Sequence, residues 1–288
     1  MCWWNRLLVR VLLAALTVAV GGFLSVTLTR YAPGFGSDER QLDARLSRES
    51  LAALREELAG ERDVATYYVG ALGRLSRGDL GRSRSLQRPV RELLAERGMV
   101  TLRLVGAGLI LAWLAGMGLT IVTWLSGSAA MDAACTVASG LLLCLPAGAL
   151  ALLLLVLEGP AYLALALVVF PKTYQYLSSL VRATTQLPHI ITARAKGAST
   201  LRIFVWHVVP VIRRELLALA GVTVGMAVGA TIPVEALCGT PGIGQLAWQS
   251  ALARDVPVLT SVSMLVIACT VVANTGADLL AGENRGAA

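Results

Sequence analysis

Six long apolar stretches dominate this sequence of 288 residues. They lie approximately at 7–29, 100–124, 134–157, 161–181, 215–237 and 258–280. A bilayer core about 30 Å thick is crossed by about 20 residues of α-helix, so each stretch is long enough to span a membrane. Apolar residues make up 56% of the chain and charged residues only 15%, which is unlike a soluble domain of this size. We therefore expect an all-α integral membrane protein with six transmembrane helices.

The segment between the fourth and fifth stretches is strongly basic. Residues 182–214 contain six Lys or Arg residues and no acidic residue. Short loops that are rich in Lys and Arg stay in the cytoplasm, which places this loop there. Counting spans in both directions then places both termini in the cytoplasm, in agreement with Arg6 and Arg10. The connector at 125–133 is expected on the same side, although its only charged residue is Asp132.

Residues 31–99 form a long polar segment with twelve Arg and eleven acidic residues. Under this topology they face outward, because long loops are translocated largely regardless of their charge. We expect a small helical extracytoplasmic subdomain here. One amphipathic helix is predicted to begin at Ser50 and to end near Gly60. A second is predicted around Tyr67, Tyr68, Leu72 and Leu75.

Several kinds of chemistry are not indicated by the sequence. The net charge of +7 does not predict nucleic-acid binding, because no basic patch is interleaved with aromatic residues. The five cysteines form no disulfide framework, and neither His189 nor His207 has a partner at metal-ligand spacing, so we expect no metal and no cofactor. The sequence lacks a Gly-x-x-x-x-Gly-Lys-Ser/Thr phosphate loop. The chain is thus expected to have no ATPase site of its own.

The basic loop contains the run Thr192-Ala193-Arg194-Ala195-Lys196-Gly197, with Pro210 thirteen positions after the glycine. Small Ala residues before a Gly favour a short helix that ends at a left-handed glycine, after which a second short helix leaves at a fixed angle. This spacing resembles the signature loop of ABC-importer permeases. The Ala-Arg-Ala-Lys-Gly form is close to the version found in dipeptide and oligopeptide permeases.

Three further blocks resemble the first membrane subunit of peptide and nickel ABC importers, so the resemblance covers nearly the whole chain. The blocks are Tyr31-Ala32-Pro33-Gly34, then Leu54-Arg55-Glu56-Glu57-Leu58 with Gly78-Asp79-Leu80-Gly81-Arg82-Ser83, and finally Glu235 with Pro241-Gly242-Ile243-Gly244 and Arg254-Asp255. The sequence departs from the family pattern at Cys238, where Phe is usual, and at Pro188, which lies in the lead-in to the run that starts at Thr192. Because Pro disfavours helix at the residue before it, we expect a first coupling helix that starts late or is short.

The resemblance implies a permease subunit of a binding-protein-dependent ABC importer in the bacterial inner membrane, with the type I fold. The implied cargo is di- or oligopeptides carried by alternating access, and nickel or another small solute is the alternative. The implied partners are a second homologous permease subunit, two ATP-binding subunits and an extracytoplasmic solute-binding protein. The implied parts are a transmembrane helix at 1–30, the extracytoplasmic subdomain at 31–99 and a permease core at 100–281. The expected ATPase-docking residues are Ala193, Arg194, Ala195, Lys196, Gly197, Ala198, Arg202, His207 and Pro210.

Lys172 lies in the middle of the fourth apolar stretch. A Lys at the bilayer centre costs about 2.5 to 3.5 kcal/mol on insertion scales, so it is expected to face a wet or protein-lined interior. One hypothesis is that Lys172, Gln175 and Tyr176 line the substrate path. The alternative is snorkelling, or a buried pair with Glu158 or Glu235.

Glu235 lies at the outer end of the fifth stretch, before a turn that contains Pro241, Gly242 and Gly244. We favour a structural pairing of Glu235, as a cap or with the outer subdomain, over a contact with substrate. The turn is expected to shape an outer gate, since Gly and Pro are turn-forming residues.

Two other function classes remain as alternatives. A membrane-embedded enzyme would need a nucleophile and a base, or paired carboxylates, at membrane depth, whereas neither His lies in a span. A proton- or sodium-driven secondary carrier would use discontinuous helices and a midplane carboxylate. Gly225, Gly229 and Pro233 could break the fifth helix in that way, but the spacing of the basic loop would then be unexplained.

Overall fold

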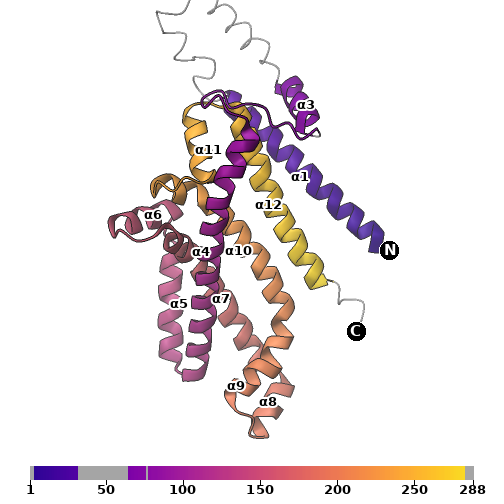
Figure 1. Ribbon diagram of the computed structural model, residues 1–288. Helices are drawn as coiled ribbons and strands as arrows, with labels where there is room; N and C mark the ends of the chain where they lie inside the picture. Colours follow the sequence, from indigo (N-terminus) through magenta and orange to yellow (C-terminus); the bar gives the residue numbers. More distant parts are fainter. Residues whose placement is uncertain (1–2, 32–63, 76, 283–288) are drawn as a thin grey trace, which may run out of the picture. The chain divides into compact units, whose positions relative to one another are not determined.

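The computed structural model describes residues 3–31, 64–75 and 77–282, and within these ranges the regular structure is helical except for one isolated β-bridge. The helices are α1 (Trp3–Tyr31), α3 (Val64–Leu75), α4 (Val90–Ser126), α5 (Ala129–Leu143), α6 (Ala147–Val156), α7 (Ala161–Thr185), α8 (Pro188–Ala195), α9 (Thr200–Ile203), the π-helical turn η2 (Phe204–Val208), α10 (Val209–Leu237), α11 (Ile243–Leu252) and α12 (Val256–Gly282) (Figure 1). The all-α prediction is therefore confirmed for the described residues. The amphipathic helix predicted at Ser50 lies outside them.

Among the residues that the structure describes, four helices are long and apolar enough to cross a membrane. Their apolar parts are Leu12–Thr29, Val90–Ser126, Thr200–Leu237 and Val256–Ala277. The third span predicted from the sequence, at 134–157, is not one straight helix, because α5 and α6 are bent by 97° where they meet. Pro146 lies at this break, with extended backbone, and its missing N–H cannot continue the hydrogen bonds of α5. These helices thus give four spans, or five if the bent pair is counted as one.

The chain folds into two compact units. The first unit comprises residues 1–98 and 246–268, and the second comprises 99–245 and 269–288. In the first unit, α3 packs against α1, where the Tyr68 hydroxyl donates to the carbonyl of Ala19 (2.6 Å) and the Tyr68 ring meets Phe23 edge-on (5.7 Å between centroids). Tyr68 also forms a buried cluster with Val26 and Met264. The amphipathic helix predicted around Tyr67 and Tyr68 is therefore confirmed as α3.

In the second unit, α7 is the central helix and contacts α5, α6 and α10. It continues through Pro171, which lies inside it. Several of its polar side chains are buried, and the Thr173 hydroxyl donates to the carbonyl of Val169 within the same helix (3.1 Å). Because α7 contacts three other helices, these buried side chains are covered by protein and do not need to be apolar. This explains why α7 is not among the four helices that qualify as spans by apolarity.

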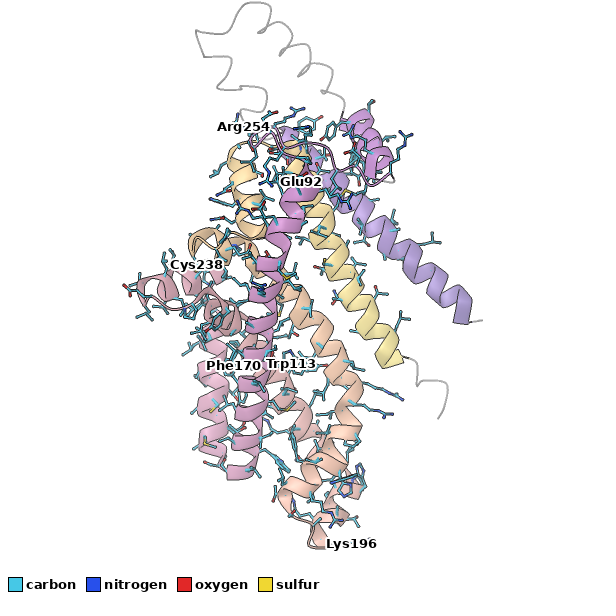
Figure 2. All side chains as sticks on the ribbon, in the orientation of Figure 1. Glu92, Trp113, Phe170, Lys196, Cys238 and Arg254 are labelled. Carbon is cyan, nitrogen blue, oxygen red and sulfur yellow. The ribbon has the colours of Figure 1, made fainter. Side chains whose placement is uncertain are left out.

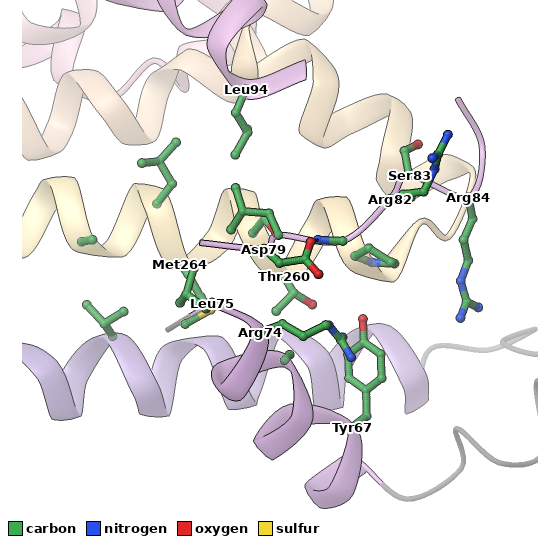
Figure 3. A pocket seen from close by; sticks show the side chains of 18 of the residues that line it. Tyr67, Arg74, Leu75, Asp79, Arg82, Ser83, Arg84, Leu94, Thr260 and Met264 are labelled. Carbon is green, nitrogen blue, oxygen red and sulfur yellow. Dashed lines mark hydrogen bonds between the residues drawn. The ribbon is translucent and has the colours of Figure 1, made fainter. Parts of the chain in front are cut away.

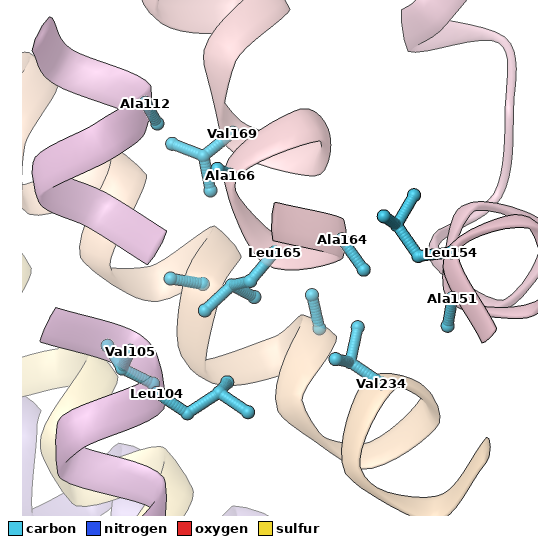
Figure 4. Close-up of a cluster of buried hydrophobic side chains, with 12 residues drawn as sticks. Leu104, Val105, Ala112, Ala151, Leu154, Ala164, Leu165, Ala166, Val169 and Val234 are labelled. Atoms are coloured by element: carbon cyan, nitrogen blue, oxygen red, sulfur yellow. The ribbon is translucent and has the colours of Figure 1, made fainter. Parts of the chain in front are cut away.

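Small residues let α4 approach α7 closely. A Cβ atom added to Gly108 would lie 2.9 Å from Leu165 Cδ2, and one added to Gly116 would lie 2.9 Å from Thr173 Cγ2. Ala112, midway between these glycines, belongs to a buried cluster together with side chains of α6, α7 and α10 (Figure 4). Lipid provides no hydrophobic force between helices, so close van der Waals packing of this kind is what holds them together.

Candidate functional site

The basic loop folds into a bent pair of short helices that we call the elbow, residues 188–208. Its first helix, α8, begins at Pro188, because a proline at the first turn needs no backbone donor. It ends in a left-handed turn at Gly197, which has φ of +79°. There the N–H of Gly197 donates to the carbonyl of Arg194 (3.0 Å) and that of Ala198 to the carbonyl of Ala193 (3.2 Å). This pair of bonds is the Schellman motif, and the predicted short helix with a glycine end is confirmed.

The second part of the elbow is continuous with α10. After Gly197 the chain forms α9, then η2, and then α10 begins at Val209 without a break. The prediction of a separate second helix is therefore only partly correct, since α9 extends the fifth apolar stretch. The π-helical turn η2 hydrogen-bonds with a wider period than an α-helix, and such turns often mark functional sites.

The elbow is anchored on the ends of α7 and α10, where Figure 1 shows α8 and α9. A buried cluster joins Val181 of α7, Ile190 of α8 and Ile203 of α9 to Ile212 of α10. The Phe204 ring packs on the ring of Trp124 at 5.4 Å between centroids. The elbow is therefore packed against both α7 and α10.

Most residues predicted to dock an ATPase are exposed. Arg194, Ala195, Lys196, Gly197, Arg202 and Pro210 are exposed, while Ala193, Ala198 and His207 are partly buried. Lys196 projects from the turn between α8 and α9 (Figure 2). Sequence reasoning missed the apolar part of this surface, which includes Ile191, Leu201 and Trp206, the last of them 71% exposed. In the sequence these apolar residues lie close to the basic residues of the loop, and this proximity was the signal that could have identified them.

An ion pair joins the α4–α5 connector to the end of α7 that carries the elbow. Asp132, in the first turn of α5, accepts from the guanidinium of Arg182, which also donates to the Ser178 hydroxyl (2.9 Å). The connector and the elbow thus lie at the same end of the second unit. The span count also places the connector on the same side of the membrane as the basic loop, although the connector contains no basic residue.

One face of α7 has an unusual composition. Between positions 164 and 181 its exposed residues are Lys172, Tyr176 and Ser179, which recur at helical spacing and are all polar or charged. The exposed residues of α4 between 104 and 125 are instead Ile110, Leu111, Leu114, Ala115, Gly118, Val122 and Leu125. Lipid tails suit the α4 surface, whereas a face that carries a Lys does not belong in lipid. We call Lys172, Tyr176 and Ser179 the polar stripe.

Two of the three predicted path residues therefore share the polar stripe. Gln175, the third, is partly buried and donates from Nε2 to the Ser139 hydroxyl on α5 (3.2 Å). Lys172 itself is exposed in the described part of the chain. Its place on a solute path, and the alternatives of snorkelling or pairing with Glu158 or Glu235, stay predictions.

Glu235 caps a helix rather than meeting water. It is 0% exposed, near the C-terminal end of α10. Its Oε2 accepts from the N–H groups of Gly244 (2.6 Å) and Gln245 (3.3 Å), which belong to the first turn of α11, and its Oε1 accepts from the Thr101 hydroxyl (2.7 Å). Thr101 in turn accepts from the N–H of Ile243 (2.8 Å). Three backbone donors that a helix start leaves without partners are thereby satisfied.

The glycines of the outer turn are required by this cap. A Cβ atom on Gly242 would collide with the Glu235 carboxylate, and one on Gly244 would lie 2.6 Å from the carbonyl oxygen of Thr231. Pro241 is exposed beside them. The structure thus brings Glu235, Gly242 and Gly244 together as one packed unit and confirms the structural cap predicted for Glu235.

A second buried carboxylate fixes the loop that precedes α4. Asp255, between α11 and α12, accepts through Oδ2 from the hydroxyl groups of Ser83 (2.6 Å) and Ser85 (2.8 Å) and from the Ser85 N–H (3.0 Å). Burial by itself raises the pKa of Asp255, but these hydrogen bonds outweigh it and hold the pKa below its ordinary value. Two sequence blocks that resemble the importer family are joined by this contact.

Comparison with known proteins finds a matching protein family and several similar proteins. Residues 108–282 match the family model of the binding-protein-dependent transport system inner membrane component. A protein of Brucella suis biovar 1 (strain 1330), named as a peptide permease, is 29% identical over 308 residues, with 96% of this chain and 94% of that protein covered. The nickel import system permease protein NikB of Staphylococcus aureus (strain bovine RF122 / ET3-1) is 25% identical over 292 residues, with coverages of 96% and 89%. The family match includes the elbow, the polar stripe and the outer turn.

Proposed function

We propose a transport mechanism for this chain, which belongs to the binding-protein-dependent transport system inner membrane component family. It acts as one permease subunit of an ABC importer in the bacterial inner membrane. Its partners are a second homologous permease subunit, two ATP-binding subunits and an extracytoplasmic solute-binding protein. The elbow and both termini lie in the cytoplasm, six segments cross the membrane with α5 and α6 as a bent third one, and ATP is hydrolysed by the separate subunits.

The elbow transmits the motion of the ATPase. Its exposed surface combines basic residues such as Arg194 and Lys196 with the apolar side chains of Leu201 and Trp206, which suits a protein partner. The elbow follows α7 directly and continues into α10, so displacement at its tip moves both helices. Since α7 carries the polar stripe and α10 carries Glu235 near its other end, the motion reaches the solute path and the outer turn. This continuity is the observation that carries the proposal.

Substitution of Gly197 tests the coupling. Gly197→Asp places a charge on the tip of the elbow, where an added Cβ meets no atom within 4 Å. The matched control is Gly127→Asp in the α4–α5 connector, because Gly127 is also exposed, has φ of +60° and meets no atom within 4 Å. We expect the Gly197 variant to insert and fold but to lose ATP-driven uptake and its association with ATP-binding subunits. Normal uptake by the Gly197 variant would overturn the docking role.

The solute is proposed to be a di- or oligopeptide. The polar stripe faces the path completed by the second permease subunit, and Lys172 attracts a carboxylate there. At about 4 Å and an effective dielectric constant near 20, opposite unit charges attract by about 4 kcal/mol before desolvation is counted, and a metal dication is repelled instead. The relative named as a peptide permease supports this cargo.

Nickel is the second candidate, because a relative of similar coverage is named as a nickel import permease. Uptake of a dipeptide with a free carboxylate, of its C-terminal amide and of Ni²⁺ separates the two. We expect Lys172→Met to reduce uptake of the free dipeptide most, and Arg103→Met, which removes an exposed cation of α4, to change little. Equal uptake of the free dipeptide by Lys172→Met and by the native chain would remove Lys172 from the path, and uptake restricted to Ni²⁺ would establish the nickel alternative.

A further inference from the structure

A pocket of about 850 Å³ lies within the first unit, at some distance in sequence from the polar stripe and the elbow. It is lined by residues of α1, α3 and α12, by loop residues between 79 and 87, and by Leu94 of α4 (Figure 3). Its volume lies in the range of small-molecule sites. One end is charged and carries the loop, and the other end is apolar.

The apolar end lies at membrane depth. Val18 contributes from the apolar part of α1, Leu12–Thr29, and Met264 and Ala268 contribute from that of α12, Val256–Ala277. Along α12 the wall runs from Pro257 to Ala268, which at 1.5 Å per residue is about 16 Å. This length is close to half of a hydrocarbon core of about 30 Å, the thickness of one leaflet.

The other end is lined by cations. Arg74, Arg82 and Arg84 line the pocket together with a single acid, Asp79. The Arg74 guanidinium lies over the Tyr67 ring, 5.8 Å from its centroid, and Arg82 donates to the carbonyl of Gln87 (3.0 Å). Within residues 3–31, 64–75 and 77–282, neither Arg74 nor Arg82 forms an ion pair with an acidic side chain. Asp79 accepts from the N–H of Gly81 (2.8 Å).

We propose that this pocket binds an anionic phospholipid, with its phosphate beside Arg74 and Arg82 and one acyl chain along α12 toward Ala268. Guanidinium groups bind phosphate oxygens through paired, charge-assisted hydrogen bonds. An acyl chain matches the apolar wall, whereas a peptide would bury unsatisfied backbone groups against it. Under the proposed topology the pocket lies on the extracytoplasmic side, so the bound lipid belongs to the outer leaflet. This assignment to a leaflet rests on the proposed function, but the binding of the lipid does not.

The bound lipid bridges α3 and α12. Arg74 lies in the last turn of α3, and Thr260 and Ser261 of α12 line the same pocket. A ligand that binds the folded protein and not the unfolded chain stabilises it in proportion to the logarithm of its concentration above Kd. Phosphatidylglycerol is therefore expected to raise the unfolding temperature of the protein more than phosphatidylcholine does.

Native mass spectrometry of the full chain in mild detergent tests the proposal directly, because it counts bound lipids without any need for ATPase or transport. The probes are phosphatidylglycerol, phosphatidylcholine and soluble glycerol 1-phosphate. We expect the double variant Arg74→Gln/Arg82→Gln to bind phosphatidylglycerol at least tenfold more weakly, and the matched control Arg91→Gln, an exposed Arg outside the pocket, to bind as the native chain does. Ala268→Phe, which fills the apolar end, is expected to weaken binding without any change in charge.

Three results would overturn the proposal. Equal affinities of the native chain for phosphatidylglycerol and phosphatidylcholine would remove the role of the anionic headgroup. Displacement of the lipid by glycerol 1-phosphate at equal concentration would show a soluble phosphate site instead. Unchanged binding in both the double variant and Ala268→Phe would place the lipid elsewhere. The first two comparisons use the native chain, so they decide the matter even if a variant fails to fold.

Discussion

Replacing Glu235 by alanine is expected to destabilise the protein strongly. The substitution removes the acceptor for the Thr101 hydroxyl and for the N–H groups of Gly244 and Gln245, in a place with no access to water. Each buried donor that loses its partner costs about 1–3 kcal/mol. With three donors affected and some relaxation, we expect a loss of about 3–5 kcal/mol. Glu235→Gln keeps one acceptor oxygen and is expected to lose about 1–2 kcal/mol.

The assay is thermal unfolding of the purified chain in mild detergent. In a chain of this size each kcal/mol corresponds to a shift of roughly 2–4 °C, so Glu235→Ala should lower Tm by about 10 °C. The matched control is Glu158→Ala, because Glu158 is an exposed glutamate of the same unit, and its substitution should change stability by no more than about 0.5 kcal/mol. Equal Tm values for Glu235→Ala and Glu158→Ala would show that the buried carboxylate does not hold the start of α11.

Three further changes have defined outcomes. Gly197→Val should destabilise the elbow by about 1–2 kcal/mol, because a β-branched residue is strained at φ of +79°. Gly197→Asn should cost less, so ATP-driven uptake in vesicles should be lower for Gly197→Val than for Gly197→Asn. Asp132→Ala should cost no more than about 1 kcal/mol, because the pair with Arg182 is partly exposed. The reversed pair Asp132→Arg/Arg182→Asp should recover the Tm, and a loss in the reversed pair greater than the sum of the two single changes would contradict an ion pair. Asp255 has a folded-state pKa below that of the unfolded chain, so its stabilisation is present above the unfolded value and is lost as the pH falls through the folded value. The Tm of the native chain should thus fall more between about pH 7 and pH 3 than that of Asp255→Asn, and parallel curves would exclude the contact with Ser83 and Ser85 as its cause.

Local features of the elbow were predictable from the sequence. The left-handed turn at Gly197 depends on the absence of a Cβ atom and on the helix-forming Ala residues before it, both of which are local properties. The amphipathic pattern around Tyr68 likewise gave α3. In each case the residues that decide the structure lie within one or two helical turns of each other.

Features that depend on distant contacts were not predictable in the same way. Glu235 is buried because Thr101, 134 positions away in sequence, closes one side of it. Asp255 is held by Ser83, 172 positions away. The bend at Pro146 lies inside an apolar run whose length alone predicted a straight span. Trp206 lies in the basic loop by sequence, but only the fold shows that its side chain is 71% exposed.

The structure determines which of the predicted path residues face the same way on α7. The sequence placed Lys172, Gln175 and Tyr176 in one span without fixing which of them face the same way. The fold turns Gln175 toward Ser139 and adds Ser179 to the exposed face of α7. A helix of this kind is stable in a membrane only if that face meets water or another protein subunit.

Site-specific photocrosslinking from position 196 tests whether the elbow contacts an ATP-binding subunit. A crosslinking residue replaces Lys196 at the exposed tip of the elbow, in cells that carry the complete transporter. The same residue at Leu114, on the apolar face of α4, serves as the control. We expect a crosslink from position 196 to an ATP-binding subunit and none to that subunit from position 114. A crosslink from position 196 to the extracytoplasmic solute-binding protein, or to no protein at all, would contradict this expectation.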